Sequence, residues 1–84
     1  MHVTVISPEA AVYEGEATAV TAPAFDGEVG ILTNHAPLMT VLGNGVLTVR
    51  GADTTRRFRV HGGFLQVVRN NVRVLAERVE RDGA

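Results

Sequence analysis

The chain has 84 residues, of which 45% are hydrophobic, with a formal net charge of −1 and no cysteine. This length fits one domain whose folding buries only about 60–65% of the unfolded surface, so we expect modest stability unless a partner covers part of it. The lack of cysteine excludes disulfides and thiol chemistry, and the near-neutral charge argues against a protein that binds nucleic acid. No apolar run approaches the roughly 20 residues that cross a bilayer, and residues 1–4 do not resemble a signal peptide. We therefore expect a protein that is cytosolic or docked to something facing the cytosol.

The first half of the chain is typical of short strands separated by turns. Residues 3–6 predict an apolar strand, and residues 11–22 predict one or two strands with a hinge near Gly15. Pro23 is expected to end this run, and residues 25–27 are a turn signal. Valine is the dominant apolar residue of the chain, which also favours strands over helices.

The second half continues the same pattern. We predict strands at residues 38–42, 46–50, 56–60, 64–68 and 72–76. Gly43-Asn44-Gly45 tolerates the positive φ of a reversal, and Asn70-Asn71 is a candidate two-residue hairpin turn. Residues 77–84 are charged and are expected to fray. Many short strands with regular turns predict an all-β sandwich or barrel, formed by a single domain of residues 1–84.

The stretch Gly27–Leu38 is the most distinctive, because it combines two glycines, a carboxylate, an apolar pair, a histidine and a proline. It is too interrupted for a helix and too apolar for an ordinary loop, and irregular segments of mixed chemistry often carry binding function. An acid–base pair of Asp26 or Glu28 with His35 is conceivable. We favour a simpler interpretation, with Asp26 in a turn, Glu28 on the surface and His35 holding loop backbone by hydrogen bonds. Catalysis would need a pocket and a perturbed pKa.

Other signatures of enzymes are missing from the sequence. His2, His35 and His61 are isolated, without a second ligand at metal-binding spacing. The only serine, Ser7, precedes a proline and lies in no nucleophile elbow, and there is no dinucleotide fingerprint or Walker A sequence. The residues thus predict no enzyme, no metal and no cofactor. The alternative is a small ligand-binding module or enzyme that uses Asp26, Glu28 and His35.

Three further features each have two interpretations. Gly62-Gly63 predicts a bulge or tight corner, and less often a place where a partner's backbone approaches. The cluster Arg56, Arg57 and Arg59 is expected on a solvated strand face, since an RNA or phosphate site would want interleaved aromatic residues. Residues 64–68 and 72–76 are apolar on both faces. This fits either burial within a sandwich or an exposed patch that another subunit covers.

Taken in order, several segments resemble the N-terminal β-sandwich domain of the epsilon subunit of bacterial F-type ATP synthase. These segments are Val5-Ile6-Ser7-Pro8, Tyr13-Glu14-Gly15, Val20-Thr21-Ala22-Pro23, Gly27–Leu32, His35-Ala36-Pro37-Leu38, Gly45-Val46-Leu47, Gly62-Gly63-Phe64 and Val72–Glu77. The resemblance runs from about Val3 to Glu77, and the order and spacing of the segments make it specific. It implies a flattened sandwich of about ten strands in two five-stranded sheets. We expect residues 3–77 to form the ordered core and residues 78–84 to form a frayed tail.

The resemblance also implies a function. Epsilon is a non-catalytic rotor subunit of the central stalk that binds the gamma subunit, rests on the ring of membrane-embedded c subunits and helps couple proton flow to ATP synthesis. The implied location is therefore peripheral, on the cytoplasmic side of the cell membrane. The residues that match the family's c-ring-facing loop are Gly27, Glu28, Val29 and Gly30, and those that match its gamma-facing side are Ser7, His35 and Thr40.

One feature of the family is missing. Members usually continue into a C-terminal pair of helices that can restrain ATP hydrolysis and in some members bind ATP. The sequence ends at Ala84, so we expect neither self-inhibition nor nucleotide binding from these residues. A five-stranded barrel that binds nucleic acid is a further alternative, disfavoured by the charge and the scarcity of aromatic residues.

Overall fold

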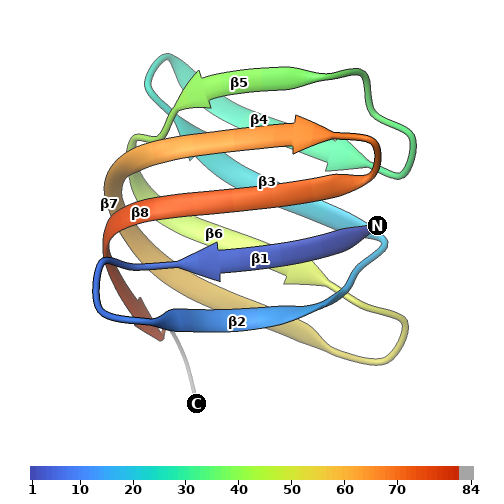
Figure 1. Cartoon of the computed structure of the whole chain (residues 1–84), viewed down its shortest axis with the longest axis horizontal. Coiled ribbons are helices and arrows are strands. Elements are labelled where there is room, and N and C mark those ends of the chain that lie inside the picture. The colour runs from blue at the N-terminus through green and yellow to red at the C-terminus, as the bar shows by residue number, and fades with distance from the viewer. Residues whose placement is uncertain (82–84) are drawn as a thin grey trace.

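The structure, a computed structural model, describes residues 1–81 and is built from β-strands joined by short turns (Figure 1). The strands are β1 (His2–Ile6), β2 (Ala11–Glu16), β3 (Ala19–Ala24), β4 (Gly27–Leu32), β5 (Leu38–Val41), β6 (Asn44–Arg50), β7 (Thr55–Val68) and β8 (Asn71–Arg81). Their sequences alternate as half-buried strands do: β8 buries Val72, Val74 and Ala76 and exposes the residues between them. In the part of the chain described, no helix has the length and hydropathy to span a bilayer.

The strands form one hydrogen-bonded sheet that folds over into two layers (Figure 1). The order is β2-β1-β8-β7-β6-β3-β4, and β5 pairs with β7. Strand β7 pairs with β6 through its first half and with β5 through its second half, and β8 follows β7 along both halves. We call β5, the second half of β7, the first half of β8, β1 and β2 the β5 layer. We call β4, β3, β6, the first half of β7 and the second half of β8 the β4 layer. The predicted all-β sandwich is confirmed, with the long strands β7 and β8 serving both layers in place of separate strands.

The sheet turns from one layer to the other at Gly62 and Gly63. Both have positive φ, 64° and 115°, which L side chains rarely adopt. A Cβ on Gly63 would also collide with the backbone carbonyl oxygen of Leu75. The β7–β8 register is the same on both sides of the turn, from Phe58 opposite Arg81 to Gly63 opposite Ala76. Gly62-Gly63 is therefore the predicted tight corner rather than a bulge, and the chain's own backbone explains both glycines.

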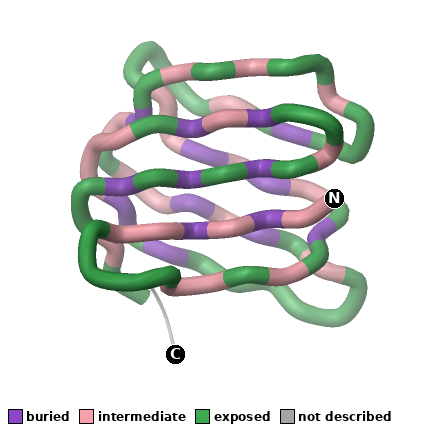
Figure 2. The backbone as a smooth tube through the Cα atoms, viewed as in Figure 1, coloured by how far each residue is buried: buried purple, intermediate pink, exposed green. Residues whose placement is uncertain are grey.

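The space between the layers holds the core. The buried residues come from both layers and are almost all aliphatic: Val3, Val5, Ala17, Val20, Ala22, Ile31, Leu42, Leu47, Val49, Phe58, Val60, Leu65, Val67, Val72, Val74 and Ala76. Figure 2 shows buried residues alternating with exposed ones along the strands. Among residues 1–81, no polar or charged residue is buried. The interior therefore offers no buried group for acid–base chemistry.

Several predicted boundaries are wrong. The expected reversal at Gly43-Asn44-Gly45 does not occur: none of these residues has positive φ, and β5 and β6 run along β7 in one direction, with Val41 opposite Phe64 and Asn44 opposite His61. The break after β2 falls at Ala17 and Thr18 rather than near Gly15, and β3 continues through Pro23 to Ala24. The β7–β8 turn is formed by residues 69–70, one position earlier than expected. Strand β8 extends to Arg81, so residues 78–81 are not frayed, because they pair with residues 58–61 of β7. The rest of the expected tail, residues 82–84, lies outside the described residues.

Candidate functional site

The Gly27–Leu38 stretch divides into three structural parts. Residues 27–32 form strand β4, residues 33–37 form a loop that crosses between the layers, and Leu38 begins β5. The prediction that the whole stretch is irregular is therefore wrong for its first half, which pairs with β3 from Ala24 opposite Gly27 to Ala19 opposite Leu32. The residues predicted to face a c ring lie on this strand rather than in a loop.

Strand β4 is an edge strand, and the predicted c-ring-facing residues lie along it. Beside β3, no other strand formed by residues 1–81 pairs with it. Glu28 is exposed, and its carboxylate makes no ion pair or hydrogen bond in the described part of the chain. Gly27 has a φ of 138°, so its own backbone explains the glycine. Gly30 has an ordinary φ, and a Cβ there would meet nothing within 4 Å. Gly30 therefore leaves bare backbone on an open edge without a structural need for it.

His35 lies in the loop at the far end of β4 and is held by local backbone contacts. Its N–H donates to the carbonyl oxygen of Leu32 at 3.1 Å, and its Nδ1 lies 2.7 Å from the carbonyl oxygen of Ala36. Because a carbonyl only accepts, Nδ1 carries the proton in this contact. The neutral ring then presents Nε2 as an acceptor. This arrangement agrees with the interpretation that His35 holds loop backbone.

The alternative acid–base pair is not assembled. Glu28 and Leu32 are four positions apart on β4, which is about 13 Å at roughly 3.3 Å per residue, and the His35 loop begins beyond Leu32. Four surface depressions of about 260 to 360 Å³ have neither Asp26, Glu28 nor His35 among their lining residues. Among residues 1–81, no three histidine or carboxylate side chains are grouped as metal ligands would be. None of these observations supports an enzyme or ligand site built on these three residues.

The outer face of the β5 layer carries a group of apolar side chains at its end nearest the Gly62-Gly63 corner, while Gln66, Arg73 and Thr4 make the neighbouring row polar. Val41, Phe64, Leu75 and Ile6 stand opposite one another on β5, β7, β8 and β1, so they form a continuous row across four strands. Val41, Phe64 and Leu75 are 48%, 53% and 43% exposed, respectively. Met39 and Val68, also exposed, lie on the same side of β5 and β7. We call these six residues the apolar face.

The sequence left open whether residues 64–68 and 72–76 are buried on both sides or exposed on one side. On β7 and β8 the residues between those of the face, such as Leu65 and Val74, are fully buried in the core. One side of these strands is therefore buried and the other is exposed. Single exposed apolar residues are ordinary on a protein surface, but here exposed or half-buried apolar residues form a row across four strands.

The predicted gamma-facing residues lie around this face to different degrees. Ser7 lines a depression of about 290 Å³ together with Ile6, Phe64 and Leu75. The His35 loop leads through Pro37 into β5, where residues 37–39 line a second depression with residues 66–68. Thr40 lies opposite the buried Leu65 and is half-buried, so its side chain is on the core side of β5. On this strand Met39 and Val41 reach the outer face in its place.

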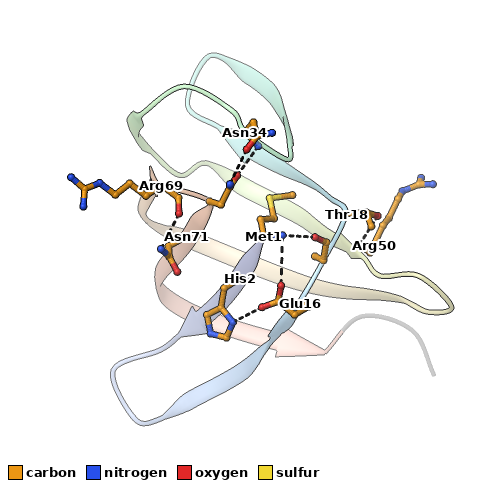
Figure 3. Close-up of polar contacts among 10 residues, drawn as sticks. Met1, His2, Glu16, Thr18, Asn34, Arg50, Arg69 and Asn71 are labelled. Atoms are coloured by element: carbon orange, nitrogen blue, oxygen red, sulfur yellow. Dashed lines mark hydrogen bonds and ion pairs between the residues drawn. The ribbon is translucent and has the colours of Figure 1, made fainter.

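A histidine that the sequence reasoning treated as isolated has two carboxylate partners. His2 Nε2 lies 2.8 Å from Glu14 Oε2. His2 Nδ1 lies 3.0 Å from Glu16 Oε2, a contact drawn in Figure 3. Hydrogen bonds to Glu14 and then Glu16 raise the pKa of His2 above its ordinary value of 6.5. The alternation along β1 and β2 could have revealed the cluster, since His2 stands opposite Glu16 in their register. Its contacts tie β1 to the edge strand β2.

The arginine cluster of β7 is exposed to solvent. Arg56, Arg57 and Arg59 are all exposed on the first half of β7. Arg57 and Arg59 lie on the outer face, as expected, whereas Arg56 lies on the same side as Phe58. The guanidinium of Arg56 lies 5.6 Å from the centre of the Tyr13 ring, within the range of a cation–π contact. Tyr13 in turn packs against the core residue Phe58, with ring centres 5.7 Å apart.

Comparisons with known proteins agree with this architecture. Residues 1–82 match the family described as ATP synthase, Delta/Epsilon chain, beta-sandwich domain. Curated relatives named ATP synthase epsilon chain include those of Leptospira borgpetersenii, 43% identical over 92% of this chain and 61% of the relative, and Caulobacter vibrioides, 40% identical over 92% of this chain and 90% of the relative. A third, from Synechococcus, is 44% identical over 94% of this chain and 58% of the relative. The chain thus spans about three fifths of the first and third relatives and most of the second.

Solved structures give the same fold. A chain in the cryo-EM structure of the Euglena gracilis mitochondrial ATP synthase superimposes with a TM-score of 0.86 at 22% identity, over 94% of this chain and 51% of that one. A chain in the central stalk and c-ring structure of the Tetrahymena thermophila mitochondrial ATP synthase gives a TM-score of 0.81 at 18% identity, over 95% of this chain and 65% of that one. At these identities the likeness shows the fold alone. From the match over residues 1–82 and the curated relatives, the chain belongs to the family of the ATP synthase delta/epsilon chain β-sandwich domain.

Proposed function

We propose that this chain is a non-catalytic rotor subunit in the central stalk of an F-type ATP synthase. It joins the gamma subunit to the c ring and helps couple proton translocation to ATP synthesis. It is held peripherally on the cytoplasmic side of the membrane through that complex. The observation that carries this proposal, beside family membership, is the apolar face of Ile6, Met39, Val41, Phe64, Val68 and Leu75, because a lone soluble domain gains nothing by exposing such a row.

The apolar face is the surface that we assign to gamma. It lies between two of the predicted gamma-facing residues, with Ser7 beside the row and His35 in the loop that enters β5. Apolar side chains supply the affinity when a partner removes them from water. The Nε2 acceptor of His35 can take one hydrogen bond that fixes the orientation of the partner. Thr40 contributes less, since its side chain lies on the core side of β5.

The open edge of β4 is the surface that we assign to the c ring. Glu28 offers an exposed carboxylate to polar or basic groups of the ring, and Gly30 lets another backbone approach closely. This edge belongs to the β4 layer, whereas the apolar face belongs to the β5 layer. Two partners can therefore bind at the same time, as an adaptor requires.

Neither nucleotide binding nor restraint of ATP hydrolysis is part of this proposal. In the relatives such roles belong to the helical pair, and the described residues 1–81 are strands and turns. The proposal also includes no nucleic acid, metal or other cofactor.

Co-purification tests the proposal. The tagged chain is recovered from its native host after mild solubilisation of the membranes, and the accompanying proteins are identified. We expect the gamma subunit and, with the membrane sector intact, the c ring. Recovery of the chain without gamma, together with specific binding of a small molecule beside His35, would support the ligand-binding alternative and overturn the proposal.

A further inference from the structure

Two asparagines that are 36 positions apart hold each other. The N–H of Asn34 donates to Oδ1 of Asn70 at 2.6 Å, and Nδ2 of Asn70 donates to Oδ1 of Asn34 at 2.9 Å. The dashed lines at Asn34 in Figure 3 mark this pair, which joins the β4–β5 loop to the β7–β8 turn. Both residues are left-handed, with φ of 67° and 61°. Asparagine tolerates this conformation better than most residues and adds the amide that makes the contact.

Asn70 is the fixed member of the pair. Its carbonyl oxygen accepts the N–H of His2 at 2.8 Å, so the turn is tied to β1 as well as to β7 and β8. Its side chain is partly buried, whereas Asn34 is exposed. The β7–β8 turn therefore serves as a rigid anchor, and the loop at Asn34 is attached to it.

The loop depends on this attachment. Within residues 33–37, the other described backbone and side-chain hydrogen bonds are local, from His35 N–H to Leu32 and from His35 Nδ1 to Ala36. In the described part of the chain, the Asn34–Asn70 contact is what ties the loop by hydrogen bonds to a distant segment. Without it the loop would be fixed only where it joins β4 and β5.

We propose that the Asn34–Asn70 pair is a positioning clamp that holds the His35 loop in register with the apolar face, so that the two form one preorganised docking surface. This inference rests on the proposed function, because it takes the partner to be the gamma subunit. A loop that is already ordered loses less conformational entropy when a partner binds. Removal of the clamp should therefore weaken binding to the partner. Neither asparagine needs to touch the partner for this effect.

Substitutions at Asn70 separate the clamp from the turn. Asn70→Gly keeps the left-handed turn, because glycine adopts positive φ freely, but removes both side-chain hydrogen bonds. Asn70→Asp should retain them: a carboxylate oxygen accepts the Asn34 N–H, and the Asn34 amide can flip so that its Nδ2 donates to the second oxygen. Arg69→Gly is the control in the same turn, since Arg69 also has positive φ, at 49°, and contributes no side chain to the clamp. Thr18→Ala controls for lost stability, because it removes a hydrogen bond to Arg50 O at a different loop.

The first measurement uses the free protein. We expect the amide of Asn34 to exchange with solvent about tenfold faster in Asn70→Gly, the effect of losing one or two hydrogen bonds, and at nearly the native rate in Asn70→Asp and Arg69→Gly. Unchanged exchange at Asn34 in Asn70→Gly would overturn the clamp. This arm needs no partner, so it stands even if the proposed function fails.

The second measurement is the affinity for purified gamma subunit. We expect Asn70→Gly to raise Kd by about 3–10-fold, and Asn70→Asp to restore affinity. Thr18→Ala should lower the stability of the domain to a similar degree and leave Kd unchanged. If lost stability alone caused the weaker binding of Asn70→Gly, Thr18→Ala would raise Kd as well. Faster exchange in Asn70→Gly with native affinity for gamma would overturn the positioning role. Failure of the unaltered chain to bind gamma would refute the proposed function, and the positioning role with it.

Discussion

Met39 and Leu32 provide a matched test of which surface meets the gamma subunit. They are 66% and 65% exposed, and both lie on strands that end a layer, Met39 on β5 and Leu32 on β4. Met39 belongs to the apolar face and Leu32 does not. Replacing each with glutamine nearly keeps the side-chain length and removes the apolar surface, so the two variants differ mainly in the layer that they alter.

The expected magnitude follows from the exposed fraction. Burying a methionine side chain fully is worth about 1.5–3 kcal/mol, and Met39 keeps 66% of its surface for a partner to cover. Met39→Gln should therefore weaken gamma binding by about 1–2 kcal/mol, or roughly 5–30-fold in Kd. The third that is already buried limits the loss of folding stability to about 0.5–1 kcal/mol. Leu32→Gln should cost the same stability and leave the affinity for gamma unchanged.

Titration calorimetry with purified gamma subunit gives Kd for both variants, and urea unfolding gives their stabilities. Equal losses of gamma affinity in the two variants would mean that the weaker binding follows from stability rather than from the apolar face. Native affinity in Met39→Gln, or a loss confined to Leu32→Gln, would refute the assignment of gamma to the β5 layer.

Three other predictions follow from single side chains. Glu28→Arg should weaken attachment to the c ring and ATP-driven proton pumping in reconstituted enzyme, with an unchanged melting temperature; normal pumping would remove Glu28 from the interface. Gly63→Ala should destabilise the fold by at least about 3 kcal/mol, through strained φ and collision with Leu75 O, whereas Gly30→Ala should change stability by less than about 1 kcal/mol, as measured by urea unfolding. His2 has a raised pKa, so its carboxylate contacts stabilise the fold below pH 6.5 and this contribution is lost as pH rises through the raised pKa. Unfolding measured against pH should show this decline, and His2→Gln should remove it; an unchanged profile would show that His2 contributes nothing.

The fold class could be predicted from the sequence, but the continuity of the strands could not. Alternating valines on β8 predict a strand with one buried face, and that prediction is confirmed. A Gly-Gly pair, however, fits either a break or a corner. At Gly62 and Gly63 the positive φ angles turn the chain while the β7–β8 register continues, so two predicted strands are one. Whether a Gly-Gly pair breaks a strand or bends it depends on how the neighbouring strand pairs with it, and the local sequence does not contain that information.

Pro23 shows the same limit. Proline was expected to end the strand because it lacks an N–H donor. In β3, the Pro23 carbonyl accepts a hydrogen bond from Gly43, and in an extended strand the nitrogen and carbonyl of one residue point to the same side. The ladder between β3 and β6 covers only residues 19–21, so the missing donor falls where no ladder needs it. The neighbouring strand, not the proline, decides where β3 ends.

The sequence suggests residues for the candidate site but does not give their arrangement in space. Asp26, Glu28 and His35 are close in sequence, but the extended strand β4 places the two carboxylates at one end and the His35 loop beyond the other. Exposure of the apolar face could not be inferred either, since residues 64–68 and 72–76 are apolar on both sides. Burial of one side and exposure of the other follow from the topology, which places the second layer against one face alone.

Some glycines of the chain are required by its own backbone conformation, and Gly30 is not. Gly63 is required twice over, by its φ and by the backbone of Leu75, and Gly27 is required by its φ. Gly30 is required by neither, although a glycine within a strand costs about 0.5–1 kcal/mol relative to alanine. A residue that weakens the fold and relieves no strain is best explained by something outside the chain. On the open edge of β4, close to the exposed carboxylate of Glu28, we propose that the backbone of a partner approaches Gly30. Gly30→Ala should then impair docking to that partner while it strengthens the isolated domain.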